Sequence, residues 1–184
     1  MPTVKLIADV APNLLPMVRT PGVHISTLID EICIELGHYK KNIEENQARF
    51  ELGNALEHAI VERLALDKPD KYLRPGELML DDSIGTPDLF EPHAEIDDEI
   101  KCTWMSANNG PGSKKFFKYE MQIKAYLHMV KWKRGRLHVV FLNGFYEKVV
   151  VGDPVYRVWE YLFSENELAA NWSTLMKQKA RKQR

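Results

Sequence analysis

Residues 85–103 restrict the fold most, because they predict a β-hairpin that carries closely spaced acids. Two runs of apolar and β-forming residues, 89–90 and 96–102, flank a turn at 91–94 that contains a proline. If the hairpin axis falls between His93 and Ala94, Asp88 and Glu99 are equally far from it and lie opposite each other. Directly opposed residues have Cβ atoms about 5 Å apart. The hairpin therefore predicts a close pair of carboxylates.

Lys101 adds a positive charge to this pair, since it follows Glu99 by two residues and side chains alternate along a strand. Two carboxylates at this separation repel each other unless a cation compensates them. Oxygen ligands favour Mg²⁺ or Mn²⁺ over zinc. Alternatively, Asp88 and Glu99 are ordinary solvent-facing residues and Lys101 is their ion-pair partner. The hairpin alone leaves both interpretations open.

The rest of the chain alternates between helical and extended patterns. Apolar periodicity and capping signals predict helices at 26–37, with Ser26 or Thr27 as N-cap, and at 41–66, 114–133 and 154–175. Further strands are expected at 77–80, 137–142 and 146–151, the last two joined by a turn at Asn143. Residues 1–25 are expected to be extended, and residues 105–113 to form a surface loop.

Two helical residues depart from the pattern around them. Glu57 lies on the apolar stripe of the second helix, one turn after Gly53, where the missing side chain permits close backbone approach. It is either an edge residue or an additional ligand or water-orienting group. His58 is expected to face away. Gln122 lies one turn before Tyr126, and its amide either has ordinary partners or bonds a metal ligand or phosphate while Tyr126 braces it.

Composition sets the class of protein. The 184 residues, 45% hydrophobic and 28% charged, predict a single globular domain over 1–184, with its core at about 41–151 and a frayed basic tail at 177–184. The tail either follows phosphates or is merely solvated. We expect a cytoplasmic protein with no membrane segment. A net charge of −1 argues against coating nucleic acid by charge alone, and two distant cysteines cannot form a four-thiolate site.

Together these pieces resemble the PD-(D/E)XK nuclease superfamily. The order is Glu57 on a helix, then Pro87-Asp88, then Glu99-Ile100-Lys101, then Gln122 and Tyr126 on a helix. The Gln-x-x-x-Tyr helix resembles the RecB-like branch. Gly53-x-x-x-Glu57 resembles the lambda-type, YqaJ-like phage recombination exonucleases.

The resemblance implies an α/β fold with a restriction-endonuclease-like core, a central mixed β-sheet flanked by helices. It also implies a metal-dependent deoxyribonuclease. Asp88, Glu99 and the Ile100 carbonyl would bind Mg²⁺ or Mn²⁺, and Glu57 would serve a second metal or its water. Lys101 would activate the nucleophile, with Gln122 and Tyr126 in support.

Departures from the family pattern leave some points open. The usual histidine of the first motif is absent at Glu57, and His58 is adjacent, so either could take part. The iron–sulfur cysteines of CRISPR-associated relatives are missing, so no iron–sulfur cluster is expected. The implied substrate is DNA, as linear duplex or single strand, with a single-strand annealing protein as a possible partner and an oligomer as a possible state.

The leading hypothesis is an exonuclease in phage-type recombination or repair, and the resemblance implies a bacterial or phage-infected host cell. The alternatives are a restriction-like or structure-specific endonuclease on the same fold, a catalytically idle DNA-binding or assembly module, and a plain α/β domain with a charged hairpin.

Overall fold

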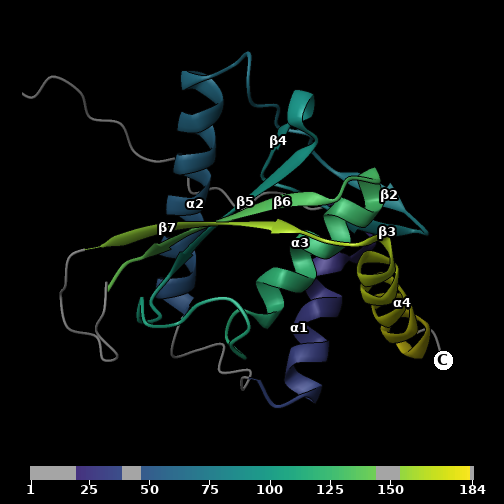
Figure 1. The fold of residues 1–184 in the computed structure, drawn as a ribbon. Coiled ribbons are helices and arrows are strands. Elements are labelled where there is room, and N and C mark those ends of the chain that lie inside the picture. The colour runs from purple at the N-terminus through teal and green to yellow at the C-terminus, as the bar shows by residue number, and fades with distance from the viewer. Residues whose placement is uncertain (1–19, 39–46, 144–153, 183–184) are drawn as a thin grey trace, which may run out of the picture.

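The computed structural model describes residues 20–38, 47–143 and 154–182, and Figure 1 shows how their elements are arranged. In chain order these are β1 (Val23–His24), α1 (Ile25–Glu35), α2 (Gln47–Asp67), β2 (Leu78–Leu80), β3 (Ser83–Gly85), β4 (Leu89–Glu91), a 3₁₀ turn (Pro92–Ala94), β5 (Ile96–Thr103), α3 (Phe117–Val130), β6 (Arg134–Phe141), β7 (Val155–Leu162) and α4 (Glu165–Lys182).

The larger sheet has four strands in the order β4-β5-β6-β7. β4 and β7 run antiparallel to their neighbours, whereas β5 and β6 are parallel. A parallel pair needs a crossover connection, which α3 supplies. The predicted hairpin is present as β4 and β5, and the predicted strand at 77–80 is present as β2. The expected α/β fold, a mixed sheet flanked by helices, is confirmed.

Helices cover this sheet on both faces. On one face, Leu137 and Val139 of β6 pack against Ile123 and Leu127 of α3. On the other, Ile100 of β5 packs against Val61 of α2 and Leu89 of β4. Because β5 is covered on both sides, a charged residue on this strand is buried whichever way it points.

A second core joins helices α1, α3 and α4, which lie together in Figure 1. Leu28, Met121 and Trp172 represent the three helices in this cluster. A small sheet in the order β1-β3-β2 lies next to it, and Leu80 packs against the cluster. This arrangement holds β3, and hence the start of the hairpin, against α3.

The first helix begins one residue earlier than predicted, and its cap is different. Helix α1 starts at Ile25, and the N-cap is His24, whose side chain makes no capping bond. His24 also pairs with Ile84 as the last residue of β1, so its backbone is already extended where the helix begins. Sheet pairing therefore replaces the expected hydroxyl cap. The predicted end near Gly37 agrees with a C-cap at Leu36.

The C-terminal third departs most from expectation. Residues 155–162, predicted as the start of the last helix, form strand β7, and the helix begins only at Glu165. β7 alternates half-buried and exposed residues along its whole length, which is the two-residue period of a strand. This segment is also rich in β-branched and aromatic residues, which favour strands. Both features outweighed the helical signals that predicted a helix here. The strand predicted at 146–151 lies outside the described residues, as do 1–19 and 39–46.

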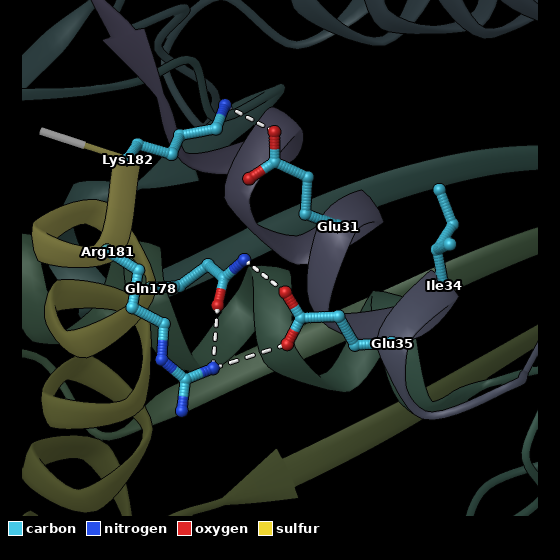
Figure 2. Close-up of a pocket in the computed structure, with 6 residues that line it drawn as sticks. All are labelled: Glu31, Ile34, Glu35, Gln178, Arg181 and Lys182. Carbon is cyan, nitrogen blue, oxygen red and sulfur yellow. Dashed lines mark hydrogen bonds and ion pairs between the residues drawn. The ribbon is translucent and has the colours of Figure 1, made fainter. Parts of the chain in front are cut away.

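The predicted frayed basic tail is wrong as far as Lys182, because α4 continues to that residue. Lys179 is buried and donates to the backbone carbonyls of Asp81 and Asp82. Figure 2 shows the neighbouring hollow of about 390 Å³ between α1 and α4. There Lys182 pairs with Glu31, and Arg181 lies 3.3 Å from Glu35. Acids of α1 thus neutralise charges that a free tail would offer to phosphates.

Basic residues at 133–136 are neutralised in the same way. Lys133 pairs with Glu165 at 2.7 Å, and Arg134 with Glu160 at 3.1 Å. Within the ranges given above, no helix has both the length and the apolarity that a bilayer crossing requires.

Candidate active site

The hairpin register is the one predicted from its turn. Leu89 pairs with Asp98, Phe90 with Asp97 and Glu91 with Ile96. In each pair the two residue numbers add up to 187. The same register, extended by one residue beyond β4, places Asp88 opposite Glu99. The predicted opposition of these two acids is confirmed.

Two carboxylates occupy the edge of β5 where β4 no longer covers it. The Ile100 N–H donates to Asp88 Oδ2 at 2.8 Å, and the Cys102 N–H donates to Glu57 Oε1 at 2.7 Å. Alternate N–H groups of a strand point to the same edge, so Asp88 and Glu57 take the acceptor positions that a neighbouring strand would fill. Each carboxylate is thereby held in place by the backbone of the strand that carries Glu99.

Glu57 reaches this edge because α2 lies close to β5. Gly53, one turn earlier, is buried, and a Cβ added there would lie 3.5 Å from the Cys102 carbonyl oxygen. That is van der Waals contact, so a larger side chain would push the helix away from the strand. The expected role of Gly53 in close approach is confirmed.

The three carboxylates converge on the Lys101 ammonium. Lys101 Nζ bonds Glu99 Oε1 and lies 3.8 Å from Asp88 Oδ2 and 4.0 Å from Glu57 Oε2. The side chains are largely withdrawn from solvent, with exposures of 1% for Glu99 and 12% for Lys101. Three carboxylates around one ammonium leave a net charge of −2 when all are ionised.

This charge excess changes how the groups titrate. Burial, followed by the charge of Asp88, raises the pKa of Glu99 to about 8. Burial also raises the pKa of Glu57. Burial alone would lower the pKa of Lys101, but the surrounding carboxylates raise it well above its ordinary value. Lys101 therefore stays protonated at neutral pH. Its single positive charge is too small to balance the three carboxylates when all of them are ionised.

Asp97 is a member of this face that sequence reasoning missed. It is fully buried two residues before Glu99, and neither of its carboxylate oxygens has a hydrogen-bond partner among the described residues. Burial and the charge of Glu99 raise its pKa well above the ordinary value. Strand alternation from Glu99 was the signal that could have found it.

Gln122 and Tyr126 lie on α3, facing the same side of the sheet. Gln122 Nε2 donates to Tyr126 Oη at 2.9 Å. Tyr126 is buried, and burial together with the charge of Glu99 raises its pKa. The ring packs against Gly85, where an added Cβ would approach Tyr126 Cε1 to 2.9 Å. The expected bracing is present, but the described contacts include no bond from Gln122 to Asp88 or Glu99.

His58 is turned away from this cluster. Its side chain is 44% exposed and pairs with Glu62 one turn along α2, with 3.2 Å between Nε2 and Oε1. Of the two adjacent candidates, the structure brings Glu57 to Lys101 and leaves His58 on the outer surface of the helix.

The donors of the cluster fit a divalent metal in chemistry and charge. In the parts of the chain described here, no three His, Cys, Asp or Glu side chains stand as a ready-formed metal site. The available atoms are nevertheless carboxylate and carbonyl oxygens, the ligands that Mg²⁺ and Mn²⁺ prefer. Glu99 Oε2 is buried and has no hydrogen-bond partner among the described residues, and the net charge of −2 is what a divalent cation balances.

Comparison with solved structures identifies the same fold in exonucleases. A phage-related exonuclease from Haemophilus somnus 129PT has a TM-score of 0.50 at 14% identity, over 83% of this chain and 78% of that one. An alkaline exonuclease from Laribacter hongkongensis, LHK-Exo, has a TM-score of 0.52 at 13% identity, over 87% of both chains. The same protein in complex with dAMP has a TM-score of 0.51. No protein-family model and no curated protein matches the sequence.

At these identities the likeness shows the fold, and that fold is the one that the resemblance to phage exonucleases implied. The roles of individual residues depend on the geometry of this chain.

Proposed function

We propose that this chain is a divalent-metal-dependent deoxyribonuclease that hydrolyses phosphodiester bonds from DNA ends. The observation that carries the proposal is the convergence of Glu57, Asp88 and Glu99 on Lys101, with more negative charge than the lysine can balance. A binding module has no need of this cluster, because unpaired carboxylates repel the phosphates of DNA.

Asp88, Glu99 and the Ile100 carbonyl would hold the metal, and Glu57 would hold a second ion or its water. A bound Mg²⁺ or Mn²⁺ would neutralise phosphate charge and lower the pKa of the attacking water. The backbone bonds to Asp88 and Glu57 fix one oxygen of each carboxylate and so orient the other. Glu99 Oε2, which no described residue hydrogen-bonds, is the other buried acceptor of this group.

Lys101 acts as a donor in this proposal. Without metal, the surrounding carboxylates raise its pKa, so its ammonium carries a proton throughout the neutral range. Its ammonium can hold a water molecule or a phosphate oxygen at the site. This refines the expected role in nucleophile activation into positioning by a fixed positive charge.

Gln122 and Tyr126 support the cluster from α3. With its amide N–H bonded to Tyr126, Gln122 can offer the amide oxygen and its remaining N–H to the site. The close packing of Tyr126 on Gly85 keeps this helix at a constant distance from the start of the hairpin.

Attack from ends is favoured over internal cutting because the neighbours with this fold are exonucleases by name. The phage-related neighbour also supports a place in phage-type recombination or repair.

The test is digestion of linear and covalently closed circular duplex DNA with Mg²⁺, with Mn²⁺ and with chelator. We expect metal-dependent loss of the linear substrate only, and no loss with Glu99→Gln. Lys177→Ala, which removes an exposed charge on α4, is the matched control and should digest normally. Cutting of the circle would identify an endonuclease. Survival of both substrates would favour a binding or assembly module.

A further inference from the structure

The two edges of the larger sheet differ in how their backbone groups are satisfied. At one edge, Leu73 exchanges two backbone hydrogen bonds of 2.8 Å with Phe90 of β4. Beyond the end of β4, the carboxylates of Asp88 and Glu57 accept backbone N–H groups of β5. At the other edge, no described strand pairs with the outer side of β7 (Figure 1). One edge is therefore closed within the chain, and the edge of β7 is open.

The register of β6 and β7 shows which backbone groups the open edge presents. The Phe163 N–H donates to the Lys133 carbonyl at 2.9 Å, and the eight residue pairs of β6 and β7 continue this register. In an antiparallel pair, every second residue bonds the neighbouring strand. The odd-numbered residues of β7 therefore point their N–H and C=O groups to β6. The even-numbered residues point theirs outward, and no described loop bonds these outward groups. They are Tyr156, Val158, Glu160 and Leu162.

The open edge lacks the features that usually keep an edge strand unpaired. Proteins protect such strands with proline, lysine, a bulge or a free charge. Residues 155–162 contain no proline, glycine or lysine, and their register with β6 is unbroken. Glu160 pairs with Arg134 and Arg136, and the Arg157 guanidinium donates to a backbone carbonyl at 2.8 Å. Both charges of the strand are thus engaged within the chain.

The side chains next to the outward backbone groups are mostly apolar. Tyr156, Val158 and Leu162 are among the exposed large hydrophobic residues of the described chain, and all three lie on the same face of β7. A long, unprotected edge strand with exposed apolar side chains favours pairing with a further strand.

A second copy of β7 has the pattern that this edge requires. When two identical strands pair antiparallel about a two-fold axis, outward residues must lie opposite outward residues. An axis at Trp159 meets this condition for all four. It places Tyr156 opposite the partner's Leu162 and Val158 opposite the partner's Glu160, and the symmetry repeats both pairs. Each pair exchanges two backbone hydrogen bonds.

The neighbouring registers fit less well. With the axis at Val158, Leu162 would lie opposite the partner's Pro154, which has no N–H to donate. With the axis at Glu160, this residue would lie directly opposite its own copy, and like charges directly opposite each other destabilise a strand pair. The register centred on Trp159 avoids both defects.

We infer that β7 is an interface at which two copies of this chain pair edge to edge, forming one continuous sheet about a two-fold axis at Trp159. The pairing uses the open edge of each copy and closes with two copies. An interface made mainly of one strand is small, so the dimer should dissociate on dilution. The inference does not depend on the proposed nuclease activity, and its tests use protein without DNA or metal.

The first test is sedimentation velocity of the full chain in chelator over a series of protein concentrations. We expect a species with twice the mass of the chain, whose fraction rises with concentration. A monomer at the highest attainable concentration overturns the inference. An assembly of three or more copies also overturns it, because a two-fold edge pairing cannot produce one.

The second test uses the charge opposite Glu160. Val158→Glu would place a carboxylate opposite the partner's Glu160 in two symmetric pairs, whereas Val158→Lys would place an ammonium there. Both changes put a charge at the same exposed position, so each variant is the matched control of the other. The dissociation constant of Val158→Glu should exceed that of Val158→Lys about tenfold or more. Equal constants for two variants with unchanged circular dichroism would contradict the pairing.

The third test locks the register with a disulfide. In a hydrogen-bonded pair, the opposed Cα atoms are about 5.5 Å apart, which a disulfide can bridge. The double variant Tyr156→Cys/Leu162→Cys should therefore form a covalent dimer under mild oxidation. In either single variant the two introduced thiols would be six residues, or about 20 Å, apart along the strands. The single variants should remain monomers on a denaturing gel, and they also control for the native Cys33 and Cys102.

Absence of the covalent dimer in the double variant overturns the inference, as does equal cross-linking of the single variants. Both outcomes are decisive even if a variant of Val158 fails to fold.

Discussion

On one face of β5, Asp98 is buried beside a histidine and an arginine, whereas on the other face Asp97 and Glu99 are buried around a single lysine. Asp98 Oδ1 lies 2.7 Å from His138 Nε2, and Asp98 Oδ2 lies 3.5 Å from Arg136 Nη1. Adjacent acids of one strand thus have opposite electrostatic surroundings. We call the side of Asp98 the compensated face and the side of Asp97 and Glu99 the uncompensated face. The compensated face stabilises the fold, and the uncompensated face has excess negative charge that a cation can balance.

The largest expected effect comes from the uncompensated face. Glu99→Gln removes a charge that the proposed metal needs. The rate of DNA digestion should fall more than about 100-fold, because losing a residue that only supports a metal ligand already costs up to about 100-fold. The free energy of unfolding should stay equal or rise, because a buried charge is removed. Digestion assays and urea unfolding measure the two effects. A large loss of stability would mean that Glu99 is structural.

His138→Ala breaks the compensated face. It removes the hydrogen-bond partner of Asp98 Oδ1 and should lower the free energy of unfolding by about 3 kcal/mol, as expected for one partner of a buried pair. Urea unfolding is the measurement. An unchanged midpoint would show that Arg136 alone compensates Asp98.

The pH dependence of the free energy of unfolding tests the charge excess of the uncompensated face without any mutation. The pKa of Glu99 is raised to about 8 in the folded state, so between about pH 5 and 8 the folded protein binds more protons than the unfolded chain. Stability in chelator should therefore fall as pH rises, by up to about 1.4 kcal/mol per pH unit for such a group. Lys101, whose pKa is raised, stays charged throughout this window.

Urea unfolding at pH 5, 6.5 and 8 tests this sign. Mg²⁺ should reduce the fall of stability with pH, because it stabilises the ionised carboxylates. In chelator, Glu99→Gln should also make this fall smaller. Stability that rises with pH over this window would contradict the charge excess.

Asp97→Asn and Asp98→Asn make the same change on opposite faces. Asp97→Asn removes a buried acid that has a raised pKa and no hydrogen-bond partner in the described parts of the chain, so it should stabilise the protein at pH 8 by about 1 kcal/mol. Asp98→Asn should destabilise it, because its carboxylate has partners. Thermal unfolding at pH 8 without metal measures both, and shifts of equal sign would remove the distinction between the faces.

The smallest effect is expected from Tyr156→Phe. Tyr156 Oη lies 2.5 Å from His138 Nδ1, but the residue is 55% exposed, so water can replace the lost bond. The loss of stability should be about 1 kcal/mol or less. A loss as large as that of His138→Ala would show that the phenol, rather than Asp98, holds the histidine.

Local patterns were sufficient where a short segment decided the structure. The turn around Pro92 set the register of β4 and β5, and alternation placed Lys101 beside Glu99. They were insufficient in the C-terminal third, where helical signals around residue 154 competed with the period of two in β7. Strand β7 forms because β6 pairs with it along its whole length.

The sequence by itself determined the acid–lysine pattern, the hairpin that opposes Asp88 and Glu99, and the mixed α/β class. Only the tertiary structure decided which helix residue joins them, because Glu57 and His58 differ by one position and the packing of Gly53 on β5 selects between them. It also decided that Asp98 is buried with two partners, whereas Asp97 is buried with none among the residues that the structure describes. Alternation assigns each acid to a face, but the neighbouring strands and helices supply the charges found there.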